Sequence, residues 1–251
     1  MRIWGAAVTI YRPQEAATLS GYPHMNPIDL QHCALFAGMA PNELQRDCPT
    51  ATIRSFDHGS TIYSQGERCS DLYCVLGGQV KLARFSREGG EFTTGLQTTG
   101  ELFGPTLGGF DLIDARETAT AKGTVTVWCV PSAEFRNFML HQPTLCLRVV
   151  ETLARRQQQM ERRLECFAFK RTEARLAETL RELSGGFESR CEHGFGQHIR
   201  LTQQELADLV GASRPVVSTI LNRLREKGVL GYNREYVCVR GIEAIEDLIG
   251  E

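Results

Sequence analysis

The sequence lacks the features that membrane-spanning and secreted proteins need. No apolar run approaches the roughly 18 residues that a helical membrane span requires. The first 25 residues contain Arg2, Arg12 and Glu15 where a signal peptide would have an apolar centre. Hydrophobic residues still make up 42% of the 251 positions, enough for the core of one large domain or two ordinary ones. We therefore expect a globular, cytoplasmic protein with no membrane partner.

Residue patterns that carry enzyme chemistry are also missing. The sequence shows no activated nucleophile, no phosphate-binding loop and no metal-ligand spacing, so we expect no enzyme and no metal site. Its nine cysteines are scattered from Cys33 to Cys238 without a C-x-x-C pair, which favours buried or idle thiols over zinc ligands. A cysteine redox switch remains an alternative interpretation, with Cys33, Cys69 and Cys166 as candidates.

The chain lacks an excess of charge of either sign, because 28 Lys and Arg nearly balance 30 Asp and Glu and the net charge is −2. The distribution is more informative than the total. Between residues 198 and 240, seven Lys and Arg stand against four acidic residues, while the tail after Arg240 carries only acids. This region is therefore a modest basic patch of the kind that nucleic-acid binding requires.

Between about residues 50 and 131, turn residues interrupt short β-rich segments every 8 to 12 positions. The segments include residues 61–63, 72–76, 79–83 and 124–130, all rich in β-branched, aromatic or aliphatic residues. The glycines between the segments are Gly59, Gly66, Gly77, Gly78, Gly89, Gly90, Gly100 and Gly104. This pattern predicts an antiparallel roll or sandwich.

A helical period replaces the β pattern after residue 142. Apolar or small residues, with one Gln, recur in a 4-3 spacing at positions 146, 150, 153, 157, 160, 164 and 167. Such a seam predicts a helix that pairs with a second copy, and Gln157 is suited to setting the register. The alternative is an amphipathic helix packed on its own domain. A second helical segment covers residues 175–183, and a polar loop follows through Gly196.

Residues 202–228 predict a helix-turn-helix. Thr202 and Glu205 form a capping box at the start of the first helix. Gly211 permits a tight turn, Ser213 caps the second helix, and that helix ends at Gly228. Its apolar positions are Val217, Ile220, Leu221 and Leu224. Residues 229–239 then predict a hairpin with a polar tip at 231–235, which would form a wing.

The second helix of this motif normally enters the major groove with its N-terminal residues. Arg214 is the candidate for contact with guanine, Pro215 and Thr219 would face base edges, and Val216 or Pro215 would touch a thymine methyl group. Thr202, Gln204 and Ser213 are expected to contact phosphates. The full set of expected DNA-contacting residues is Thr202, Gln203, Gln204, Ser213, Arg214, Pro215, Val216, Thr219 and Arg223.

Four stretches carry a pattern shared with one protein family. They are Ile62–Glu67 with Leu72–Tyr73 and Gly78–Val80; Gly100–Gly104; Leu153–Arg156; and Leu201–Glu205 through Ser213–Val217 with Ile220–Leu221. Over roughly residues 30 to 240 the chain resembles the CRP/FNR superfamily of bacterial transcription regulators.

The resemblance implies an α+β protein with three parts after an N-terminal extension over residues 1–27. A jelly-roll-like β-roll sensor domain is expected over residues 28–142, a dimerisation helix over 143–168 and a winged helix-turn-helix domain over 169–251. It also implies a homodimer on a palindromic site in double-stranded DNA, with RNA polymerase as a partner if the protein is an activator. The alternative is a sensor or scaffold for a small molecule or a protein, in which the helix-turn-helix is vestigial.

The chain departs from the family pattern at the effector site. In cyclic AMP-responsive members, the glycine that corresponds to Gly104 is followed by a ribose-binding Glu, and an Arg-Ser pair at the positions of Ala115 and Arg116 binds the phosphate. Here Pro105 follows the glycine, Arg116 comes one position late, and Met160 replaces an adenine-reading Thr. Ordinary cyclic AMP binding is therefore not expected. The remaining effector candidates are Gly104, Arg116, Glu117, Thr118, Arg156 and Met160.

Other cofactors have little support in the sequence. An iron–sulfur cluster would need closely spaced N-terminal cysteines, whereas Cys33 and Cys48 stand fifteen residues apart. Haem would need one of His24, His32, His58 or His141 as its ligand, and no pattern favours any of them. The recognition helix also departs from the family, because Pro215 and Thr219 replace the Glu and second Arg common there. We expect a half-site that keeps the guanine read by Arg214 and differs at neighbouring positions.

Overall fold

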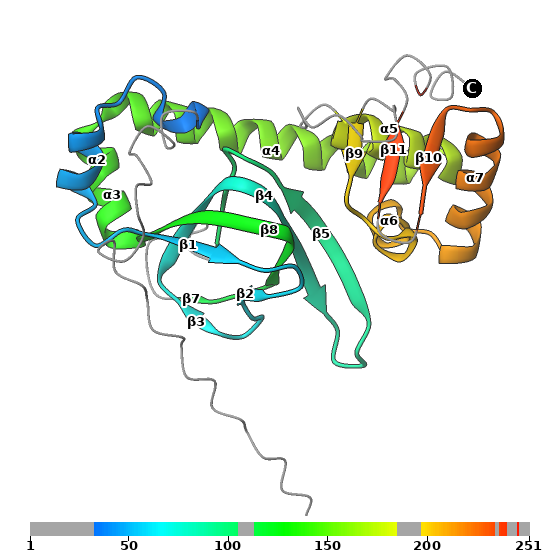
Figure 1. Cartoon of the computed structure of the whole chain (residues 1–251), viewed down its shortest axis with the longest axis horizontal. Helices are drawn as coiled ribbons and strands as arrows, with labels where there is room; N and C mark the ends of the chain where they lie inside the picture. The colour runs from blue at the N-terminus through cyan, green and yellow to red at the C-terminus, as the bar shows by residue number, and fades with distance from the viewer. Residues whose placement is uncertain (1–32, 105–112, 185–196, 234–235, 240–244, 246–251) are drawn as a thin grey trace, which may run out of the picture.

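The computed structural model of the chain describes residues 33–104, 113–184, 197–233, 236–239 and 245. The expected extension over residues 1–27 lies outside this part, and so does Pro105. An antiparallel β-roll is connected by one long helix to a second domain of helices and a small sheet (Figure 1). The expected α+β class with a β-roll and a helix-turn-helix is confirmed.

The roll is built on an antiparallel sheet in the order β1-β8-β4-β5, in which β2 also pairs with β8 and β6 with β4; β3 and β7 form a separate pair. Short helices adjoin it at one end. The elements are η1 Ala34–Phe36, α2 Pro41–Asp47, β1 Thr52–Phe56, β2 Thr61–Tyr63, β3 Arg68–Cys69, β4 Asp71–Phe85, β5 Glu91–Gln97, β6 Leu102–Phe103, β7 Ile113–Asp114, β8 Thr118–Pro131 and α3 Ser132–His141.

The expected break at Gly77 and Gly78 is absent, because residues 72–76 and 79–83 belong to one strand, β4. Pairing with β8 continues through the two glycines with register shifts on either side of Gly77. Gly78 has a φ of +83°, and a Cβ there would collide with the carbonyl oxygen of Thr124. The glycines therefore form a bulge inside a long strand rather than a turn between two strands.

Two hydrophobic clusters hold the roll together. The outer cluster packs η1, α2, α3 and the start of the long helix against the sheet, with Phe36 and Phe135 in edge contact with Trp128. The inner cluster fills the roll and includes the stacked rings of Tyr63, Tyr73 and Phe103, whose centroids lie 5.1 to 6.2 Å apart. The two clusters place the long helix at a defined position along the roll.

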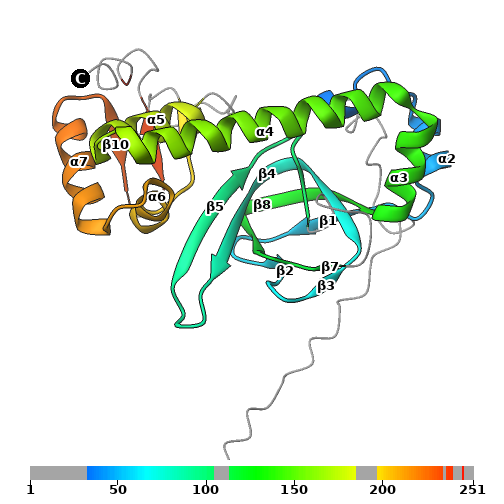
Figure 2. The same cartoon turned by 180° about the vertical axis from the view of Figure 1, so that it is seen from behind.

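The long helix α4, Pro143–Phe169, extends from the α3 end of the roll to the second domain (Figures 1 and 2). Leu145 and Val149 face the roll and are buried. The positions of the 4-3 seam are all exposed: Cys146, Val150, Leu153, Gln157, Met160, Leu164 and Phe167. One side of α4 thus packs within the chain, and the seam side does so only near the end of the helix, where Phe167 lies against Gly211.

The described part of the second domain contains the helices α5, α6 and α7 and an antiparallel sheet of order β10-β11-β9. Its elements are α5 Thr172–Ser184, β9 Gln197–Ile199, α6 Gln203–Val210, α7 Arg214–Glu226, β10 Leu230–Tyr232 and β11 Val237–Val239. Strand β9 falls just after the expected loop and was not predicted. Leu96 of β5 belongs to the same buried cluster as Leu206 and Leu209, so the two domains share a core.

Candidate nucleic-acid interface and its contact with the roll

The start of α6 is a capping box, as the sequence predicted. The Thr202 hydroxyl accepts from the N–H of Glu205, and the Glu205 carboxylate accepts from the N–H of Thr202 at 2.9 Å. The helix ends at Gly211, whose φ of +59° is left-handed. A Cβ at Gly211 would also collide with the ring of Phe167 on α4. Glycine is therefore required there by the turn and by the long helix together.

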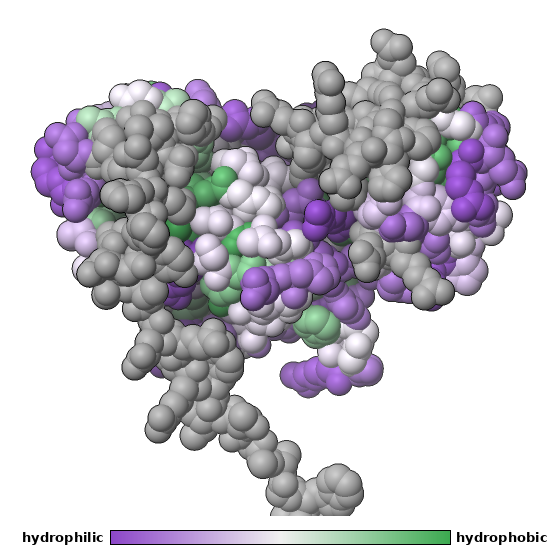
Figure 3. Space-filling view, viewed as in Figure 1, coloured by the Kyte–Doolittle hydropathy of each residue, from purple (hydrophilic) through white to green (hydrophobic). Residues whose placement is uncertain are grey.

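Helix α7 presents its N-terminal residues to solvent. Arg214, Pro215 and Val216 are exposed, as is Thr219 one turn later, while the apolar residues of the other face are buried in the domain core. Hydrophilic residues gather over this end of the molecule (Figure 3). Arg214 makes no hydrogen bond or ion pair with any residue that the structure describes. Its guanidinium is therefore available to an external acceptor.

Several of the other expected DNA contacts already have intramolecular partners. Thr202 donates to Glu205 at 3.0 Å, Gln204 donates to Asp208 at 2.9 Å, and the Thr219 hydroxyl donates to the carbonyl oxygen of Pro215 at 2.9 Å. Each of these polar groups would have to share or exchange its partner in order to reach DNA.

Arg223 is likewise engaged, because its guanidinium binds both carboxylate oxygens of Glu173 on α5, at 3.2 and 2.9 Å. Ser213 precedes α7 as expected, but its hydroxyl makes no capping hydrogen bond, which corrects the expected cap. The helix is instead preorganised by Pro215 in its first turn. Gln203 is half-buried at the start of α6.

The predicted wing is the antiparallel pair of β10 and β11, and β9 adds a third strand beside β11. The Tyr232 hydroxyl donates to the side-chain oxygen of Asn222 on α7 at 2.6 Å, and the Arg225 guanidinium lies 5.1 Å from the centroid of the Tyr232 ring. These contacts fix the wing against the recognition helix. The expected tip residues 234–235 lie outside the described residues.

The helix-turn-helix also contacts the roll through a buried ion pair that the sequence did not reveal. Glu205 of α6 is only 6% exposed, and its carboxylate binds the ammonium groups of Lys122 on β8 and Lys81 on β4, the latter at 2.9 Å. Lys81 also binds Glu91 of β5 at 2.6 Å. Glu205 therefore caps α6 and joins it to two strands of the roll.

The surroundings of Glu205 lower the pKa of its carboxyl group. Burial by itself would raise the pKa of the carboxyl group, but hydrogen bonds from Lys122, the Thr202 backbone and Lys81 more than offset burial and lower the pKa to about 2. The charged form is therefore the one that the folded protein stabilises.

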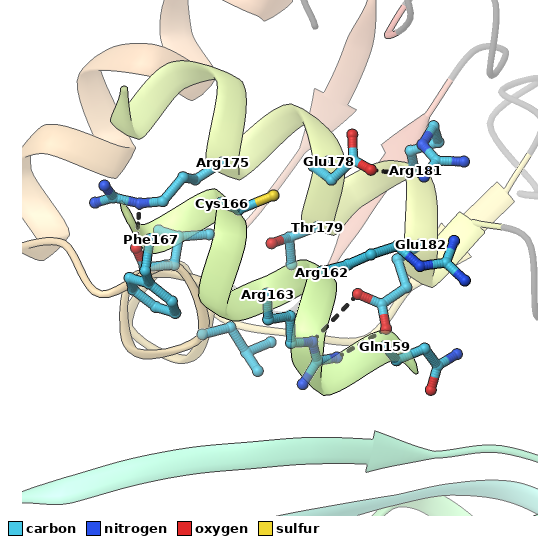
Figure 4. Close-up of a pocket in the computed structure, with 12 residues that line it drawn as sticks. Gln159, Arg162, Arg163, Cys166, Phe167, Arg175, Glu178, Thr179, Arg181 and Glu182 are labelled. Atoms are coloured by element: carbon cyan, nitrogen blue, oxygen red, sulfur yellow. Dashed lines mark hydrogen bonds and ion pairs between the residues drawn. The ribbon is translucent and has the colours of Figure 1, made fainter. Parts of the chain in front are cut away.

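A second contact region lies where α4 meets α5 and α6. A cavity of about 210 Å³ opens there (Figure 4). Arg163 of α4 binds both oxygens of Glu182 on α5 and also donates to the carbonyl oxygen of Thr94 on β5, at 3.2 Å. Arg175 of α5 donates to the carbonyl oxygen of Val210 at 3.0 Å. Arg163 thus joins the end of α4 to both domains, and Arg175 joins α5 to α6.

Some of the expected effector residues gather near the contact between α4 and the roll. Arg156 reaches from α4 to the carbonyl oxygen of Leu102 and to Oε1 of Gln97, and its burial lowers the pKa of the guanidinium. Glu117 accepts from the hydroxyls of Tyr63 at 3.4 Å and Thr94 at 3.2 Å.

The other expected effector residues do not join that group. Met160 is 56% exposed on the seam of α4, and Arg116 is exposed while its neighbour Ala115 is buried inside the roll. The Thr118 hydroxyl accepts from the backbone N–H of Gln65 at 3.0 Å. Gly104 ends β6 with a φ of +128°, where a Cβ would lie 3.0 Å from the carbonyl oxygen of Asp71. The six residues thus form no single polar pocket.

A winged helix-turn-helix joined by a long helix to a β-roll defines a DNA-binding regulator with a sensor-type domain. Two family models match the chain: one described as a Crp-like helix-turn-helix domain, over residues 174–248, and one described as a cyclic nucleotide-binding domain, over residues 53–142. Their order along the chain is that of the two domains. The chain belongs to the CRP/FNR family of DNA-binding transcription regulators.

Individual relatives agree with this assignment. The chain is 29% identical over 217 residues to the cyclic AMP receptor protein of Thermus thermophilus, a match that covers 85% of this chain and 95% of the relative. It is 28% identical to the cAMP-activated global transcriptional regulator CRP of Salmonella typhimurium, over 75% of this chain and 90% of the relative. A transcriptional regulator of the CRP/FNR family from Thermus thermophilus has a similar structure, with a TM-score of 0.65 at 25% identity over 79% of this chain and 98% of that one.

The buried carboxylate leads to a test by substitution. Glu205→Gln keeps an acceptor for the Thr202 N–H but removes the charge that faces Lys81 and Lys122. The pKa difference between about 2 in the fold and about 4.3 in an unfolded chain corresponds to at most about 3 kcal/mol. We expect the variant to lose about 1–3 kcal/mol of unfolding free energy at neutral pH, measured by urea denaturation followed by circular dichroism.

The pH dependence supplies the control. Because the folded pKa is lowered, the contribution of Glu205 is complete above the unfolded value and is lost as the pH falls from about 4.3 towards about 2. The stability difference between wild type and variant should shrink over that range. A difference that stayed constant with pH would contradict an electrostatic role for Glu205.

Proposed function

We propose that the protein is a cytoplasmic homodimer that binds a palindromic DNA site through two copies of α7 and regulates transcription without cyclic AMP as an ordinary effector. The exposed apolar seam of α4 carries the proposal, because pairing of two copies along this seam would bring a second α7 to the DNA. If the protein activates transcription, RNA polymerase is its further partner.

The seam has the composition of a helix pair. Val150, Leu153, Met160, Leu164 and Phe167 are each at least 40% exposed in the single chain. Each lies in the 4-3 spacing at which two helices interlock, and each would be buried by a second α4. A neighbouring face of the same helix, which carries Leu145 and Val149, packs on the roll, so a second copy can reach the seam without displacing the roll.

Dimerisation through α4 places two helix-turn-helix motifs at the same end of the helix pair. A two-fold axis between them requires two half-sites of opposite orientation, about one DNA turn apart. Arg214 then reads guanine through its bidentate fork. Pro215 brings no hydrogen-bond acceptor to the next position, and Val216, which is 44% exposed, offers an apolar contact to a thymine methyl group.

Among the residues of the roll that the structure describes, which do not include 105–112, the groups around Glu117 do not fit a cyclic nucleotide phosphate. A phosphate beside the Glu117 carboxylate would be repelled, and the buried Ala115 offers it no donor. Arg156 is the nearby cation, but its guanidinium is already bound to Gln97 and the Leu102 carbonyl. The stacked rings of Tyr63, Tyr73 and Phe103 fill the interior around this group.

DNA binding is tested at Arg214. A consensus site selected from random duplexes by the purified protein provides the probe, and fluorescence anisotropy provides the affinity. Arg214→Ala should weaken binding by about 1–3 kcal/mol, or about 5- to 150-fold, with the guanine preference relaxed. Arg87→Ala, an exposed arginine of the roll, is the matched control and should bind as wild type. Equal affinities of Arg214→Ala and wild type would favour a scaffold with a vestigial motif.

The dimer is tested at Leu164, which is 62% exposed on the seam. Leu164→Glu places a charge in the proposed interface of both copies. Loss of about 2 kcal/mol per copy raises the dimer dissociation constant roughly a thousandfold, which sedimentation or native mass spectrometry would detect. Leu140→Glu, at a 71% exposed leucine of α3, is the matched control and should still have the native mass of a dimer. If both variants stay dimeric, α4 is not the interface.

The effector proposal is tested by calorimetric titration of the wild-type protein with cyclic AMP. We expect no saturable heat corresponding to a dissociation constant below about 1 mM. DNA affinity measured with and without the nucleotide should also be the same. Micromolar binding that changes DNA affinity would overturn this part of the proposal and leave DNA recognition by α7 intact.

A further inference from the structure

Two cysteines that are far apart in the sequence meet beneath the sheet of the roll. Cys33 precedes η1, Cys74 lies in β4, and their sulfur atoms are 3.5 Å apart. The side chains are 2% and 0% exposed. Neither the DNA interface nor the contact between α6 and the roll uses this pair.

The surroundings make the two thiols unequal. The hydrogen bond with Cys74 is the largest cause that lowers the pKa of Cys33, burial opposes it, and the backbone N–H groups of Leu35 and Phe36 add to the lowering, so the pKa falls to about 7. The same hydrogen bond and burial raise the pKa of Cys74. The two shifts have opposite directions, so Cys33 is the thiol of the pair that ionises more readily, as in a pair of a nucleophile and a resolving thiol.

Other buried cysteines of the roll differ from this pair. Burial raises the pKa of both Cys48 and Cys129 to about 12, so these thiols stay protonated. The sulfur of Cys69 lies 3.5 Å from the Tyr73 hydroxyl rather than from a second sulfur. Among the described cysteines, Cys33 alone combines a contact to a second sulfur with a lowered pKa.

We propose that Cys33 and Cys74 are a modification site, at which a peroxide converts the two thiols into a reversible disulfide. The Cys33 thiolate attacks one oxygen of hydrogen peroxide, so that an S–O bond forms and the O–O bond breaks. Hydroxide leaves and takes up a proton to become water. The Cys74 sulfur then attacks the sulfenic sulfur of Cys33, an S–S bond forms, and the hydroxyl group leaves as water with the Cys74 proton. In total, the two thiols lose two electrons and two protons, and one hydrogen peroxide is reduced to two waters.

The required movement is small. The sulfur atoms must approach from 3.5 Å to about 2.05 Å. Cys74 is held by its pairing with Trp128 on β8 and Leu102 on β6, so Cys33 would make most of the shift. The bond would join the segment before η1 to the centre of the sheet. It would lie beside Leu102, whose carbonyl oxygen accepts from Arg156 of α4.

Peptide mapping of the wild-type protein tests the proposal. The native chain is treated with hydrogen peroxide, the remaining thiols are alkylated, and a nonreducing digest is analysed by mass spectrometry. We expect a cross-linked peptide that contains Cys33 and Cys74 and lacks two hydrogen atoms, and that separates after dithiothreitol treatment. Oxidation of the more accessible Cys146 and Cys166 without any Cys33–Cys74 link, in protein that circular dichroism shows to be folded, would overturn the proposal.

Variants assign the two roles. In Cys74→Ser, the sulfenic acid on Cys33 has no resolving thiol, so dimedone should label Cys33, whereas wild type should be labelled little. Cys48→Ser is the matched control at another buried cysteine and should form the disulfide as wild type does. Dimedone labelling that is equal at Cys33 in Cys74→Ser and in wild type would show that Cys74 does not resolve Cys33. The wild-type cross-link decides the proposal if a variant fails to fold.

Discussion

The orientation of the helix-turn-helix in this chain depends on one buried carboxylate. Glu205 closes the capping box that begins α6, and it also binds a lysine from each of two neighbouring strands of the roll. The two lysines compensate the buried charge, so their ion pairs with Glu205 favour the position of α6 against β4 and β8. Leu96 of β5, packed in the core of the DNA-binding domain, adds an apolar contact at the same place.

The long helix α4 attaches to the roll and also carries the exposed apolar seam, and it does so with two different faces. Leu145, Val149 and Arg156 attach one face to the roll, while the 4-3 seam remains exposed on another. Near its end, Arg163 binds both α5 and β5, and Phe167 lies against the glycine of the helix-turn-helix. A change in the roll that moves α4 would therefore reach the DNA-binding domain through direct contacts, which is the kind of rigid-body coupling found in many regulators.

Local signals in the sequence predicted much of the architecture. The capping box at Thr202, the left-handed Gly211, the helix over the seam and the β-rich region all depend on neighbours within a few residues, and the structure contains each of them. The break at Gly77 and Gly78 was wrong, because pairing with β8 continues across the bulge. Strand β9 was missed because residues 197–199 are too short to show a period and form a strand only beside β11.

The sequence by itself determined the helix-turn-helix with its capping box and glycine turn, the long helix, and the position of Arg214 at the exposed start of α7, because caps, glycine turns and helical periods are local properties. Only the tertiary structure decided that Glu205 pairs with Lys81 and Lys122, that Arg223 is bound by Glu173, that Arg156 contacts the roll while Met160, one turn further along α4, is exposed, and that Cys33 meets Cys74. These contacts join residues from different elements. Their energies depend on burial and on distances that exist only once the domains have packed.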